Sequence, residues 1–196
     1  MTIDENGVVY NVNKQDMEKY YSNPEQFWAG IKELAPFSFT NSGAKSLVIP
    51  NTVKRIQSRA FHSAKHLEKI VLPEGLKEIE KDTFRWCWSL KEVYIPKSVL
   101  KIGDNAFAAC ESLVNVDIPE GVEEIGDYVF FHCHLLEKSV IPASVKKVGG
   151  NIFTGCGRIK EVYFLGNPDV KADTTAGLRD GVKVYLRCQE EQEAGL

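Results

Sequence analysis

A repeat of 23 residues runs through the middle of this chain and restricts its fold more than any other feature. Five consecutive segments align in one frame without a gap. They begin at Pro50, Pro73, Pro96, Pro119 and Pro142. A phenylalanine recurs at Phe61, Phe84, Phe107, Phe130 and Phe153. A unit this short cannot bury its own apolar side, so successive units must stack into a solenoid.

The order of apolar residues inside one repeat predicts its local structure. In the second repeat Phe84, Cys87 and Leu90 are spaced by three, which is typical of helical or 3₁₀ turns. Val93 and Ile95 then alternate with polar neighbours as in a strand, and a proline closes it. We therefore expect an α/β solenoid of 23-residue coils, with a parallel β-sheet on one face and short helical or 3₁₀ turns on the other.

The shared frame, LxxIxxPxxVxxIGxxAFxxCxxL, resembles the leucine-rich repeats of the BspA-type family, known from bacterial cell-surface proteins and some protists. On this frame residues 45–165 form five leucine-rich repeats. Residues 1–44 are expected to form an N-terminal cap of a hairpin or loop plus a helix. Residues 166–196 are expected to form a degenerate terminal repeat, a last strand in "VKVYL" and a polar tail. The resemblance implies binding to proteins of hosts or of other microbes.

The expected cap helix lies in "NPEQFWAGIKEL", where Asn23 is the N-cap and Pro24 the first helical residue. Its apolar stripe consists of Phe27, Trp28, Ile31 and Leu34. This stripe is expected to cover the first coil of the solenoid.

Composition excludes several classes of protein. A net charge of −3 and a pI near 5.9 are unlike those of a nucleic-acid-binding domain, which carries a basic surface. No apolar run reaches the ~20 residues that span a bilayer, so we expect no membrane insertion. The start of the chain has no secretory signal, which favours the cytoplasm if the chain is complete, whereas the family resemblance implies the cell surface or secretion.

The stretch "FFHCH" suggests a metal- or thiol-dependent activity around His132, Cys133 and His134. The repeat offers another interpretation, because Cys133 belongs to a column of small residues. That column consists of Ala64, Cys87, Cys110, Cys133 and Cys156. Its thiols spread over roughly 14 Å and are poorly aimed at one ion or at each other, so free buried thiols are expected. On a helical turn the two histidines would flank Cys133 on different sides, about 200° apart, with His134 near Glu111.

The outward face of the sheet carries the main candidates for partner binding. One column reads Val48, Val71, Tyr94, Asp117, Val140 and Tyr163. Exposed apolar rows mark contacts, although β-branched and tyrosine residues also suit strands for their propensity alone. In the adjacent column Lys69 is expected to neighbour Glu92, and Lys138 to neighbour Glu161, so that opposite charges in adjacent strands largely neutralise each other.

Trp86 and Trp88 flank Cys87 and are candidates for aromatic anchors on the turn side. Alternatively they cover a coil edge, with Trp88 beside Lys65 in a cation–π pair.

These residues predict a non-catalytic, monomeric protein that binds an unidentified protein partner through the outward face of its sheet, in an adhesion-like role. Neither a catalytic residue, a cofactor nor a metal is expected. Two alternatives remain at this point: the thiol or metal chemistry above, and a structural module of a larger surface protein.

Overall fold

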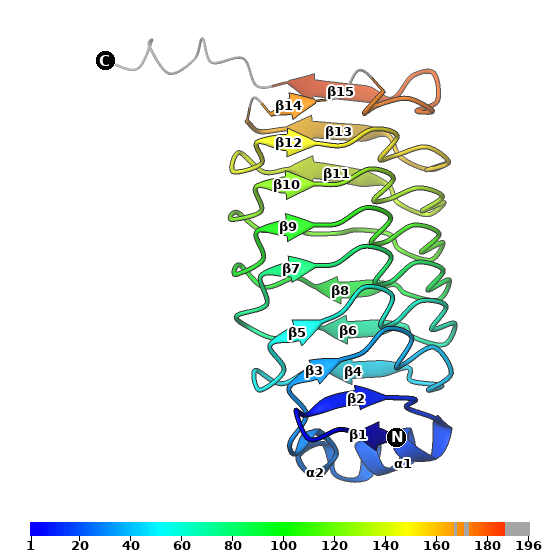
Figure 1. Ribbon diagram of the computed structural model, residues 1–196. Helices are drawn as coiled ribbons and strands as arrows, with labels where there is room; N and C mark the ends of the chain where they lie inside the picture. Colours follow the sequence, from blue (N-terminus) through cyan, green and yellow to red (C-terminus); the bar gives the residue numbers. More distant parts are fainter. Residues whose placement is uncertain (167, 171–172, 187–196) are drawn as a thin grey trace.

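The chain winds into one stack of coils, with the N-terminus at one end of the stack and the last described strand, β15 (Lys183–Leu186), at the other (Figure 1). This computed structural model describes residues 1–166, 168–170 and 173–186. Each coil has three sides: a row of longer strands, a row of two-residue strands, and a run of turns between them. We call these the long-strand face, the short-strand face and the turn edge.

The long-strand face confirms the predicted parallel sheet. Its strands are β4 (Ser46–Val48), β6 (Lys69–Val71), β8 (Glu92–Tyr94), β11 (Lys138–Ile141), β13 (Glu161–Phe164) and β15 (Lys183–Leu186). They pair one repeat apart, so that Val71 lies opposite Tyr94, and Val140 opposite Tyr163. The predicted outward columns are therefore rows of neighbours in the sheet.

This sheet is interrupted in the third repeat, which the regular frame did not predict. It consists of two three-stranded sheets, β4-β6-β8 and β11-β13-β15, and residues 115–118 between them form no strand. The third repeat places Asp117 where its neighbours carry Tyr94 and Val140, and it also contains Asn115; both residue types are depleted in strands.

The short-strand face is a second row of strands that the sequence pattern did not reveal. Its strands are β3 (Glu33–Leu34), β5 (Arg55–Ile56), β7 (Glu78–Ile79), β9 (Lys101–Ile102), β10 (Glu124–Ile125), β12 (Lys147–Val148) and β14 (Asp169–Val170). The row divides into two ladders between β5 and β7. Two residues are too few to show the alternation by which a strand is recognised.

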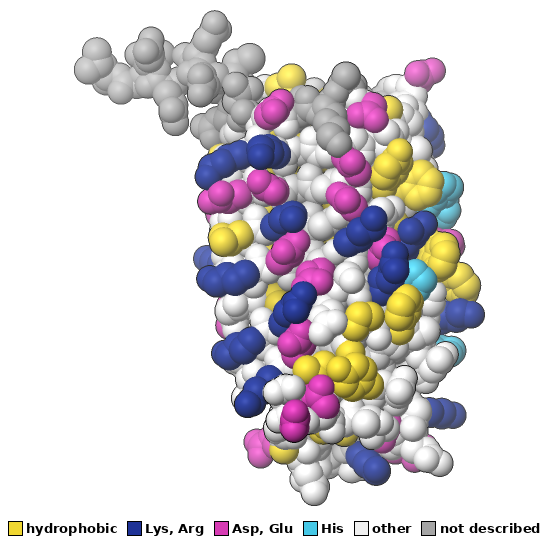
Figure 2. Space-filling view, in the orientation of Figure 1, with side chains coloured by type: hydrophobic (Ala, Val, Ile, Leu, Met, Phe, Trp, Pro, Cys, Tyr) yellow, Lys and Arg dark blue, Asp and Glu magenta, His cyan; other side chains and the backbone are white. Residues whose placement is uncertain are grey.

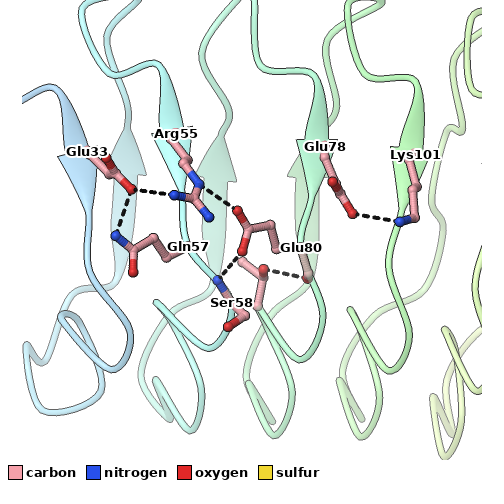
Figure 3. A network of polar contacts seen from close by, with 8 residues as sticks. Glu33, Arg55, Gln57, Ser58, Glu78, Glu80 and Lys101 are labelled. Atoms are coloured by element: carbon pink, nitrogen blue, oxygen red, sulfur yellow. Dashed lines mark hydrogen bonds and ion pairs between the residues drawn. The ribbon is translucent and has the colours of Figure 1, made fainter.

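Ion pairs tie neighbouring coils together across the short-strand face (Figure 3). The Arg55 guanidinium reaches Glu33 at 3.2 Å in one neighbouring coil and Glu80 at 2.8 Å in the other. Lys101 pairs with Glu78 at 3.1 Å. Exposed pairs of this kind stabilise by ~0–1 kcal/mol each, so they contribute more to charge balance than to stability.

The turn edge consists of single i→i+3 turns instead of a continuous helix. The N–H of Cys87 donates to the carbonyl of Phe84 at 3.1 Å, which explains the spacing by three. Trp86, which lies between them, has φ +64 in the left-handed region, and this backbone conformation ends the turn. The N–H groups of Phe84 and Trp86 donate to Ala106 and Ala108 of the next coil, so the turns also form a ladder.

Stacked phenylalanines fill the core beneath the turn edge, as the repeat predicts. The members Phe61, Phe84, Phe107, Phe130 and Phe153 are all fully buried. Successive ring centroids lie 5.2–6.0 Å apart with interplanar angles of 6–15°. Offset stacking at this separation is favourable beyond the area that each ring buries.

The ladder begins before residue 45, where the frame was expected to start. Strand β3 pairs with β5, with Leu34 opposite Ile56, and the Phe39 ring lies 4.8 Å from that of Phe61. These pairs are 22 residues apart, so an alignment at 23 residues without gaps does not detect them. Residues 1–44 thus contain a coil as well as terminal elements.

The predicted cap helix was wrong in its length. Helix α2 (Pro24–Trp28) begins with Asn23 as N-cap, as predicted, but ends at Trp28, because Gly30 adopts φ +79. Leu34 lies in β3 instead. A helix that was not predicted, α1 (Lys14–Ser22), precedes it, and the hairpin of β1 (Thr2–Ile3) and β2 (Val8–Tyr10) closes this end. Trp28 stacks on Phe39 at 6.1 Å and covers the ladder.

The predicted last strand is present at the other end of the stack. Strand β15 pairs with β13, and Tyr185 stacks on Tyr163 at 4.4 Å. Cys188 and the predicted polar tail lie outside the described residues.

Adjacent coils approach closely on the short-strand side at Gly149, where a larger residue would meet the backbone of the preceding coil. A Cβ on Gly149 would fall against the carbonyl carbon of Gly126 and 2.5 Å from the Asp127 nitrogen. We expect Gly149→Ala to lower the free energy of unfolding by about 1–3 kcal/mol, because the coils must separate. In Gly157→Ala, the control, the new Cβ meets its nearest atom at 4.0 Å. Equal urea midpoints for the two variants would contradict this close packing.

Candidate functional site

The long-strand face exposes the predicted column of apolar and aromatic side chains. Val48 and Tyr94 are 55% and 52% exposed, and Asp117 is also exposed. Val71, Val140 and Tyr163 are half-buried. Each projects outward because its neighbours along the strand pack into the core.

A groove of about 740 Å³ lies on this face beside the interruption in the sheet. Its lining comes from β6, β8 and the unpaired third repeat: Lys69, Ile70, Val71, Lys91, Glu92, Val93, Tyr94, Val114, Asn115 and Asp117. The sequence predicts Val71, Tyr94 and Asp117 as candidate partner-binding residues, but it does not predict a groove. The poor strand formers Asn115 and Asp117 were the signal that could have located it.

Salt bridges neutralise the lysines around the groove. Lys69 pairs with Glu92 at 2.6 Å, which confirms the predicted cross-strand pair, and Lys91 pairs with Glu68 at 2.7 Å. The Tyr94 hydroxyl donates to the Glu74 carboxylate at 3.2 Å, and this bond to an anion raises the pKa of Tyr94.

Lys138 and Glu161 lie opposite each other in the sheet, as predicted, but the ammonium and the carboxylate contact Tyr163 and not each other. The Lys138 ammonium instead lies 4.6 Å from the centre of the Tyr163 ring. The Tyr163 hydroxyl donates to the Glu161 carboxylate at 3.1 Å, so Tyr163 interacts with both charged residues. A cation over an aromatic ring competes well with an exposed ion pair.

The turn edge carries a second row of exposed aromatic residues. Trp86 and Trp88 are 41% and 42% exposed. Lys65 lies 5.0 Å from the Trp88 ring centre, which confirms the predicted cation–π pair, and Arg85 lies 4.8 Å from that of Trp86. Both tryptophans are thus covered in part by cations of the protein itself. In Figure 2, yellow and cyan side chains gather along this edge, at the right of the view.

The four cysteines of the column are buried and unbridged, as their spacing predicts. Each thiol donates a hydrogen bond to a phenylalanine carbonyl of the preceding coil, at 3.0–3.2 Å. Burial raises the pKa of Cys87 and of Cys156 to about 12, and also raises the pKa of Cys110 and Cys133. A protonated thiol is a poor nucleophile, so these cysteines support packing rather than chemistry.

The two histidines beside Cys133 do not flank it on different sides, and that prediction was wrong. His132 has φ +56, so helical spacing does not apply, and its ring contacts that of His134 with centroids 5.1 Å apart. His134 Nδ1 lies 2.9 Å from the Gly155 carbonyl and makes no bond to Glu111. Within the described ranges, no three histidine, cysteine or carboxylate side chains converge as a metal site would require.

The short-strand face offers less to a partner than the long-strand face. Its outward side chains are mostly charged and pair between coils, so that basic and acidic groups interleave on the face seen in Figure 2. In the part of the chain that the structure describes, no helix has the length and apolarity needed to cross a bilayer.

Stacked parallel strands, ladders of identical side chains and a 23-residue period define a leucine-rich-repeat solenoid. The family model "BspA type Leucine rich repeat region" matches residues 32–160 in six copies. This protein therefore belongs to the BspA-type leucine-rich repeat family. The sixth copy agrees with the additional coil around β3.

Solved bacterial leucine-rich repeat proteins share this fold. The T. pallidum leucine rich repeat protein is 28% identical over 85% of this chain and 78% of its own, with a TM-score of 0.64. A leucine rich cell surface protein from Faecalibacterium prausnitzii A2-165 is 20% identical over 84% of this chain and 54% of its own, with a TM-score of 0.56. A comparison with curated proteins gave no match.

Proposed function

We propose that this protein is a non-catalytic interaction module that binds another protein through its long-strand face. The observation that carries the proposal is the groove of about 740 Å³ beside the exposed Tyr94. Tyrosine supplies a large, rigid contact surface at low entropic cost, and solenoids bind partners through extended faces of this kind. Membership of a family known from bacterial cell-surface proteins favours an adhesion-like role, with the tyrosine and valine column as the contact.

The geometry supports binding over catalysis. The Cys133 thiol is fully buried with a raised pKa, and its hydrogen bond runs to the Phe107 carbonyl instead of to a base. A nucleophile needs a base within hydrogen-bond reach and access to substrate. The Cys133 thiol meets neither requirement.

Removal of two tyrosines tests the proposal. We expect Tyr94→Ser combined with Tyr163→Ser to abolish capture of protein partners from cell-surface and host extracts, since it removes the aromatic contacts of the face. Stability should change by less than about 1 kcal/mol, because neither side chain belongs to the core. Affinity capture with quantitative mass spectrometry measures the loss against the unaltered protein.

A matched pair on the turn edge serves as the control. Trp86→Ser combined with Trp88→Ser removes two exposed aromatics from a different side of the coil and should leave capture intact. If the tryptophan variant loses its partners while the tyrosine variant retains them, the turn edge is the binding surface and the proposal is wrong.

A further inference from the structure

The interruption in the long-strand face leaves strand edges without partners. Among the strands of the described residues, β8 pairs only with β6, and β11 only with β13. Elsewhere on this face the next coil is bonded, as where the Lys91 N–H donates to the Glu68 carbonyl at 2.8 Å. Residues 115–118 make no backbone hydrogen bond within the described chain. The backbone of residues 115–118 is therefore free to pair with another chain.

The interruption also opens the apolar wall of the core. Ile70 and Val162 are fully buried in the inward column, whereas Val93 on β8 is half-buried. In the unpaired repeat, Val116 and Ile118 are each 8% exposed, more than any other residue of the core. An apolar side chain from outside would find apolar contact at this point.

The charge at the groove favours a cation. Lys69 and Lys91 are already paired with carboxylates of neighbouring coils. Asp117 makes no hydrogen bond or ion pair with any described residue. Among those same residues, the Glu74 carboxylate contacts the Tyr94 hydroxyl and no cation. The exposed Tyr94 ring lines the same groove as Asp117. An aromatic face beside an uncompensated carboxylate suits a lysine or arginine side chain.

We propose that the groove at the interruption, between β8 and residues 114–117, seats an extended basic segment of the protein partner by adding a strand to the sheet. Backbone groups of the segment pair with the free strand edge. Its alternate side chains divide between the two faces, apolar ones toward Val93 and cationic ones toward Tyr94 and Asp117. This inference rests on the proposed function and specifies the chemistry of the partner.

Two short peptides test the proposal on the intact protein. Acetyl-(Val-Lys)₃-amide supplies alternating apolar and cationic side chains, and acetyl-(Val-Glu)₃-amide has the same length with the opposite charge. In titrations followed by ¹⁵N NMR, we expect only the lysine peptide to bind, with the largest shifts at Glu92–Tyr94 and residues 115–118. No binding of the lysine peptide up to millimolar concentration overturns the proposal, as does equal binding of both peptides or shifts elsewhere.

Two substitutions at Asp117 separate the role of charge from that of the open edge. Asp117→Asn removes the charge and should weaken binding of the lysine peptide by about tenfold or more. Asp117→Val introduces the residue type that Val140 has at the equivalent position, and it should allow residues 115–118 to pair within the sheet. We then expect the same loss of peptide binding, together with slower amide exchange at residues 115–118. Binding equal to the parent's in both variants overturns the proposal.

Failure of the peptide-binding proposal can be distinguished from failure of the proposed function. If partner capture depends on Tyr94 and Tyr163 but the lysine peptide does not bind, the partner uses this face in another way and only the present inference fails. If capture is unaffected by both tyrosines, the proposed function itself fails.

Discussion

Phe107→Ala lowers the free energy of unfolding by about 3–5 kcal/mol, the range for a buried phenylalanine truncated to alanine. The Phe107 ring is fully buried at the middle of the ladder, with its centroid 5.3 Å from that of Phe84 and 5.9 Å from that of Phe130. Its loss opens a cavity that the neighbouring coils cannot fill, because each is held by hydrogen bonds to the next. Urea unfolding followed by circular dichroism measures the change.

A second phenylalanine provides the control for this experiment. Phe37 is 47% exposed on the turn edge, so Phe37→Ala should cost about 1 kcal/mol or less. An unchanged midpoint for Phe107→Ala, or equal effects of the two substitutions, would contradict the role of the ladder.

Alkaline pH should destabilise the protein steeply, because of the cysteine column. The ordinary pKa of a thiol in the unfolded chain is about 9, whereas burial raises the pKa of Cys87 and Cys156 to about 12 in the folded protein. Between these values the unfolded state has lost protons that the folded state retains, so stability falls as pH rises. Each thiol contributes at most about 1.4 kcal/mol per pH unit in that window.

The first repeat supplies the control for this prediction, because Ala64 occupies the same column. A variant with alanine at the four column cysteines should be less stable at pH 7 but should lose stability more slowly from pH 8 to pH 11. Tyrosines and lysines titrate equally in both proteins, so the difference in slope reports the thiols. Identical slopes in urea unfolding would contradict the burial of neutral thiols.

The repeat predicts the stacking of the coils because each column has one physical requirement. The fully buried ladder position holds phenylalanine in all five repeats, and the position beneath the turn holds a small residue such as Cys110 or Ala64. The left-handed residues Trp86 and His132 escape prediction, because their conformation is imposed by hydrogen bonds to the next coil. Propensity along the chain contains no information about such bonds.

The sequence predicts which side chains of the candidate site point outward, but it does not predict the groove. Alternation places Tyr94 and Tyr163 outward, and the register of the strands brings them into one row. The groove depends instead on the failure of one repeat to pair, through Asn115 and Asp117. A frame averaged over five repeats conceals that single departure.

Hydroxyl-radical footprinting of the complex with a captured partner tests the central claim most directly, because one measurement reports exposed aromatic side chains on both faces. Binding through the long-strand face predicts strong protection of Tyr94 and Tyr163, with Trp86 and Trp88 labelled as in the free protein. Protection of the two tryptophans with unchanged labelling of the two tyrosines would contradict it.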